Sequence, residues 1–171
     1  MSKFIRETSM TLFDDKLVHC SIGTYAQVNF DFEHCWEIRK KYRPHTLTMI
    51  HVHPDNCLYM STMGKVNDRN MVKGWAQAFG IPIIFIIISK DAAFDASKRY
   101  DWRLVKYVVK LENNKPVIYE TLSFPDMDKI AIVGPLKYLT EASTNSWLNN
   151  VNFNRLKKKV NKRIEISKIL L

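Results

Sequence analysis

The chain has 171 residues and a net charge of +9, with 46% hydrophobic and 12% aromatic residues, enough for one domain with a substantial core. Its longest apolar run, residues 81–88, is far shorter than the roughly eighteen residues of a membrane helix, and residues 1–7 lack a signal peptide's apolar core. Three cysteines without CxxC spacing argue against a disulfide framework and a cysteine zinc site, so we expect a soluble protein in the reducing cytoplasm.

The first half of the chain predicts strands, a helix and a further strand. Two β-rich segments come first, Thr8–Phe13 and Leu17–Phe30, and the second is expected to bend at Gly23. A helix capped by Asp31 should then continue through Tyr42. The alternating residues of Thr46–His53 predict the next strand.

The second half begins with a helix near Val66–Phe79, which Gly80 closes. The β-branched run 81–88 predicts a strand covered on both faces, and Trp102–Leu111 with Pro116–Leu122 predict a hairpin around an Asn-rich turn. We therefore expect an α/β (α+β) fold in which a mixed β-sheet is flanked by helices.

Two histidines at the end of the Thr46–His53 strand are candidate metal ligands. Alternation along a strand places Leu47, Met49, His51 and His53 on one face, opposite Thr48, Ile50 and Val52. The Cβ atoms of His51 and His53 would then lie roughly 6 to 7 Å apart, close enough for both rings to bind one ion. The alternative is that two polar residues simply end a strand.

Asp68 is a candidate for a third ligand. It shares a helical stripe with Val72, Trp75 and Phe79, so it should point inward from the first turn of its helix. A buried carboxylate needs a cation or several hydrogen-bond donors, and the helix N-terminus alone is an alternative source of donors. Two His and one Asp with a fourth position open would be the ligand set of a catalytic zinc site.

These residues resemble the motif of the JAMM (JAB/MPN) metalloproteases, which have a Glu on an early strand, then H-x-H-P, then a Ser followed three residues later by an Asp. His51–Pro54 matches H-x-H-P, and Ser61 stands where the family has its serine. The position three residues further is Gly64, so a match to Asp68 implies an insertion of four residues. The resemblance covers residues 4–123.

The resemblance implies a sheet layered as in the MPN/JAB and cytidine deaminase folds, and a Zn²⁺ held by His51, His53 and Asp68. Glu7, which lies 44 residues before His51, would be the catalytic base, with Glu33 and Glu37 as alternatives. Ser61, or Thr62 if the loop is shifted, would stabilise the oxyanion. The implied activity is hydrolysis of a peptide bond, or of an isopeptide bond to a ubiquitin-like C-terminus, in a protein or peptide substrate.

The remaining residues, 125–171, are expected to form a C-terminal helical extension beside a domain at residues 1–124. Residues 153–171 carry +6 of the net charge, and an apolar stripe at helical spacing predicts a basic amphipathic helix formed around Phe153, Leu156, Val160 and Ile164. This helix either docks on the domain or forms an arm for an anionic partner such as nucleic acid or an acidic protein. Two alternatives to the enzyme follow: an inactive interaction scaffold of the same fold, or a basic nucleic-acid-binding protein.

Overall fold

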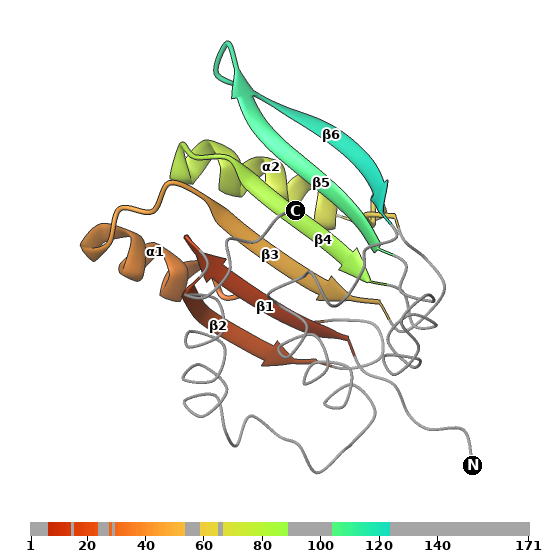
Figure 1. Ribbon diagram of the computed structural model, residues 1–171, viewed down its shortest axis with the longest axis horizontal. Helices are drawn as coiled ribbons and strands as arrows, with labels where there is room; N and C mark the ends of the chain where they lie inside the picture. Colours follow the sequence, from red (N-terminus) through yellow and green to blue (C-terminus); the bar gives the residue numbers. More distant parts are fainter. Residues whose placement is uncertain are drawn as a thin grey trace.

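The computed structural model describes residues 7–14, 16–23, 28, 30–53, 59–64, 67–88 and 104–123 (Figure 1). The described elements are β1 (Thr8–Phe13), β2 (Lys16–Ile22), α1 (Phe32–Lys41), β3 (Leu47–Val52), α2 (Asp68–Phe79), β4 (Ile83–Ile88), β5 (Leu104–Glu112) and β6 (Lys115–Ser123). Their order is the predicted one. The expected C-terminal extension, residues 125–171, lies outside the described residues.

The strands form one mixed sheet in the order β2-β1-β3-β4-β5-β6. β1 is antiparallel to both β2 and β3, and β4 to β6 form an antiparallel meander. β3 and β4 are parallel at the centre, because the chain crosses through α2 between them. The general α+β class is therefore confirmed, and the central parallel pair ends beside the N-terminus of α2.

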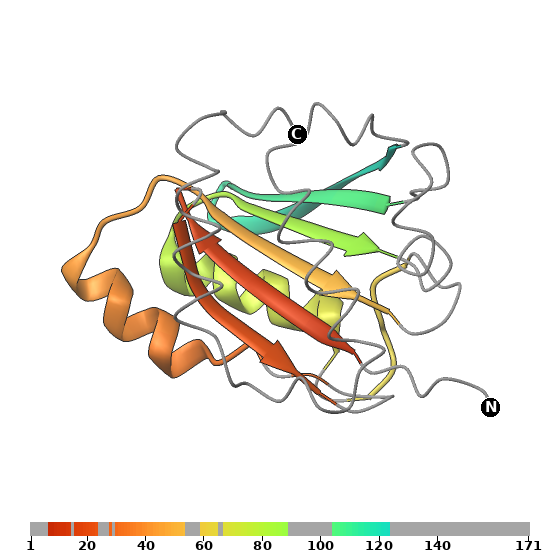
Figure 2. The ribbon, with the colours of Figure 1, turned by 60° about the horizontal axis from the view of Figure 1, so that its bottom comes forward.

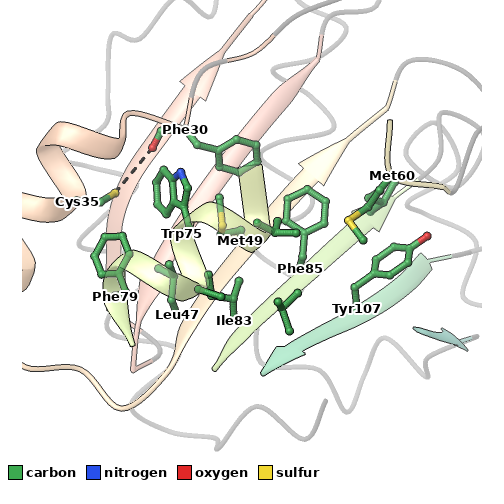
Figure 3. Close-up of a cluster of buried hydrophobic side chains, with 14 of the residues drawn as sticks. Phe30, Cys35, Leu47, Met49, Met60, Trp75, Phe79, Ile83, Phe85 and Tyr107 are labelled. Carbon is green, nitrogen blue, oxygen red and sulfur yellow. Dashed lines mark hydrogen bonds between the residues drawn. The ribbon is translucent and has the colours of Figure 1, made fainter. Parts of the chain in front are cut away.

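Both helices lie on the same face of the sheet, as Figure 2 shows. A cluster of buried side chains joins them to it, including Trp75 and Phe79 of α2 and Met49 and Phe85 of the central strands (Figure 3). Neither described helix covers the opposite face, yet the side chains there are also fully buried: Met10, Leu12, Ile50, Val52, Ile86 and Ile88. The predicted alternation in β3 and the two-sided burial of β4 are thus confirmed.

Local signals explain where the helices begin and end. The Asp31 side chain caps α1, as predicted, by accepting a hydrogen bond from the His34 N–H. The helix ends at Lys41, one residue before the predicted end, with Tyr42 as its C-cap. The start expected near Val66 was two residues early, because Asn67 caps α2 by accepting from the Asn70 N–H. Gly80 closes α2 with φ of 66°, a conformation that glycine adopts without steric cost.

The strand predicted over Leu17–Phe30 was too long, because β2 ends at Ile22 and the described residues Gly23, Val28 and Phe30 are not in a strand. The predicted hairpin is present, and Asn113 and Asn114 both take positive φ in its turn. Among the described residues, neither helix is long and apolar enough to cross a membrane.

Truncation of Phe79 should test how the α2 face depends on its aromatic cluster. Phe79 is 1% exposed and packs against Phe13, Phe32, Trp36 and Trp75. Phe79→Ala should lower the free energy of unfolding by about 3 to 5 kcal/mol, because it leaves a cavity in a packed core. Urea denaturation followed by circular dichroism measures this loss. Tyr119→Ala on β6, where the side chain is 48% exposed, should cost far less; equal losses would contradict this assignment of the core.

Candidate metal centre

The pairing of β1 with β3 brings Glu7 to the two histidines. In this antiparallel register Ser9 lies opposite His51, so Glu7, two residues earlier on the same face, comes to the end of β3. The Glu7 Oε2 atom lies 3.2 Å from His51 Nε2, within hydrogen-bond distance. The side chains are only 14% and 5% exposed, respectively. The glutamate and the first histidine are therefore in direct contact in a largely buried site.

Asp68, the first residue of α2, faces both imidazoles from the opposite side. Its Oδ1 lies 3.5 Å from His51 Nδ1, and its Oδ2 lies 3.4 Å from His53 Nε2. The Asp68 side chain is 10% exposed and does not turn toward solvent. The structure thus brings together the two histidines and the acid that the spacing and the resemblance had selected.

Ser61 and Asp68 hold each other by two reciprocal hydrogen bonds. The Ser61 N–H donates to Asp68 Oδ2 at 2.9 Å, and the Asp68 N–H donates to Ser61 Oγ at 2.8 Å. Of the residues between them, Gly64 has a φ of 85°. Because Ser61 Oγ accepts the backbone hydrogen bond, its own hydroxyl hydrogen remains available for another acceptor. A serine seven positions from the aspartate therefore still lies beside it.

The other candidates raised by the sequence lie away from this group. Glu33 and Glu37 are exposed on α1, and the Glu37 carboxylate pairs with Lys40 at 2.7 Å. Thr62 is exposed, and its carbonyl accepts a hydrogen bond of 3.4 Å from the Asn67 side chain. Of the alternatives, the described geometry favours Glu7 and Ser61.

Aromatic rings enclose His51 on the side of the core. Phe30 and Phe85 stand edge-on to its imidazole, with ring centroids 5.5 and 6.2 Å away, and His53 lies at 4.5 Å. Sequence analysis missed Phe30, because it lies just before α1 and no local spacing connects it with β3. These rings keep water from one side of His51 and so strengthen its interactions with the nearby carboxylates.

The two carboxylates make His51 a strong base in the metal-free protein. Burial alone would lower the pKa of His51, but Asp68 and Glu7 outweigh it and raise the pKa to about 9. Burial would raise the pKa of Asp68, but the two imidazoles and the Ser61 N–H hold it well below its usual range. At neutral pH the metal-free site is therefore an imidazolium between two carboxylates.

The donor atoms fit a metal ion. Ligand atoms of Glu7, His51 and His53 all lie within 4.8 Å of one another. The predicted ligand Asp68 is not in this group, because it approaches His51 at Nδ1, whereas Glu7 approaches Nε2. Although Nδ1 is 3.5 Å from Asp68, the geometry is not that of a hydrogen bond, and the buried Nδ1 lacks such a partner among the described residues. Imidazole nitrogens and carboxylate oxygens are the donors that Zn²⁺ accepts in catalytic sites.

Comparison of the chain with protein-family models, with curated proteins and with solved structures found no match.

The stability of the metal-free protein should fall as the pH rises from neutral to above 9. The folded-state pKa of His51 is raised, so its contribution is complete below the ordinary value of 6.5 and is lost as the pH passes about 9. The shift corresponds to about 3 kcal/mol. Urea denaturation of chelator-treated protein measures the decline, and NMR titration of the imidazole assigns it. His51→Gln should lack this component, and an equal decline in both proteins would contradict the assignment.

Proposed function

We propose that this protein is a zinc-dependent amide hydrolase of the JAMM type, a peptidase or isopeptidase. The observation that carries the proposal is the convergence of His51, His53 and Asp68 at the end of β3, with Glu7 on the far side of His51. Three ligands and an adjacent buried acid are the minimum for hydrolysis by a metal-activated water. The match to the H-x-H-P motif supports the family named here.

In the proposed mechanism His51, His53 and Asp68 hold Zn²⁺. When bound, the ion would supply a water of lowered pKa and would polarise the scissile carbonyl group. Glu7 would take a proton from the attacking water and pass it to the leaving nitrogen. Its carboxylate contacts His51 at Nε2, whereas Asp68 contacts Nδ1, so this role requires the His51 ring to turn when it binds the ion. His51 would bind the ion as a neutral imidazole, so it would give up its proton on doing so.

Ser61 is proposed to stabilise the charge that develops on the substrate oxygen. Its Oγ is fixed by the Asp68 N–H, while the residue itself is exposed to an approaching substrate. A donor held in this way needs no reorganisation when the oxyanion forms, and removal of such a donor costs about 3 to 4 kcal/mol of barrier in other enzymes.

A second candidate function is a non-catalytic scaffold of the same fold. The favouring observation is that a protonated His51 between Glu7 and Asp68 offsets one of the two buried negative charges without a metal. Separately, the +6 charge of residues 153–171 supports an anionic partner such as nucleic acid, and the free Cys20 and Cys35 support a cytoplasmic location.

Zinc content distinguishes the enzyme from the scaffold. Protein purified without chelators should contain one zinc per chain by atomic emission, and His53→Ala and Asp68→Ala should each lose it, because each removes a ligand. His45→Ala removes an exposed histidine and is the matched control that keeps the metal. Zinc-free wild-type protein from zinc-supplied cells would contradict the proposal.

Replacement of each acid separates a base from a ligand. If Glu7 is the base, Glu7→Gln should retain zinc and lose about 10²- to 10⁴-fold in hydrolysis of a quenched-peptide library or of ubiquitin-linked lysine. Asp68→Asn should lose the metal itself. The isosteric control Glu33→Gln on α1 should behave like wild type. Loss of zinc from Glu7→Gln would instead assign Glu7 to the ligand set with His51 and His53.

A further inference from the structure

The loop that precedes α2 carries an unusual pair of side chains. Among the large hydrophobic residues that the structure describes, the two most exposed are Met63, at 87%, and Tyr59, at 64%. Both lie within residues 59–64, the stretch that also contains Ser61. Single exposed apolar residues are ordinary, but two beside a candidate active site indicate a contact surface.

This stretch is held in place by hydrogen bonds and by packing. The Asn67 side chain donates to the carbonyl groups of Thr62 and Gly64, the two residues on either side of Met63. The Ser61 carbonyl accepts from the Arg69 N–H, and Met60 is buried in the core cluster. Met63 therefore projects from a backbone that is fixed on both sides, which lowers the entropy lost when a partner binds.

The geometry points to Tyr59 and Met63 as an apolar lip that holds a hydrophobic side chain of the polypeptide substrate next to the scissile amide. The lip is only two residues from Ser61 in either direction, so a substrate amide near the oxyanion donor places a neighbouring side chain against it. Tyrosine and methionine suit this role, since both are enriched in protein contact surfaces and methionine adapts to different partners.

This inference rests on the proposed function for the identity of the ligand. It adds that the substrate is an extended polypeptide and that its apolar residues contribute to selection.

The test uses full-length, zinc-loaded protein and a quenched-peptide library in which one position at a time is fixed as Leu, Phe, Ser or Asp. Wild type should favour Leu and Phe at one position near the cleaved bond. Met63→Ser and Tyr59→Ser should each reduce kcat/KM for those peptides by about tenfold, mainly through KM, and leave Ser peptides unchanged. Tyr119→Ser, an exposed tyrosine on the distant edge strand β6, is the matched control that should not alter selectivity.

Binding of the same peptides to Glu7→Gln, measured by fluorescence anisotropy, separates the lip from catalysis. The lip is supported if Glu7→Gln binds Leu and Phe peptides more tightly than Ser peptides and the double variant Glu7→Gln, Met63→Ser does not. This result would support the lip even if no variant cleaves a peptide and the hydrolase proposal fails. Cleavage with unchanged selectivity in Met63→Ser overturns the lip and leaves the hydrolase. If no apolar peptide is bound or cleaved, the lip is overturned as well.

Discussion

The buried carboxylate of Asp68 is the constraint on which the candidate site depends. A charge at this depth is costly unless several partners compensate it, and here two imidazoles, the Ser61 N–H and the N-terminal end of α2 do so together. These partners come from β3, from the loop before α2 and from α2 itself. One acid therefore ties the three segments together at the end of the central parallel strands.

His51 extends this arrangement to β1, because its second nitrogen contacts Glu7. The histidine is thus placed between two acids, and the group carries more negative than positive charge even when the ring is protonated, because one imidazolium faces two carboxylates. A proton on His51 offsets one of the two negative charges, whereas a divalent ion would offset both. The proposed metal centre and the ion-pair cluster are two ways of compensating the same pair of acids.

Much of this arrangement follows from periodicity. The two-residue period of a strand places His51 and His53 with Met49 on the face that α2 covers. The 3.6-residue period of a helix turns Asp68 inward with Val72 and Trp75. Features that depend on single side chains were not predictable in this way. The Asn67 cap makes α2 begin later than expected, and β2 ends earlier than expected, at Ile22. Phe30 contacts His51 from a segment that is neither helix nor strand.

The reciprocal bonds between Ser61 and Asp68 have a consequence for how such chains vary over evolution. The hydrogen bonds join Ser61–Gly64 to Asn67 and Asp68, so residues added between Gly64 and Asn67 should cost little, since loop closure depends weakly on length. A single residue added within β3 would instead turn both imidazoles to the other side of the sheet. Divergent relatives should therefore keep the H-x-H interval strictly and differ in the serine-to-aspartate interval, so a fixed-spacing motif search would overlook them.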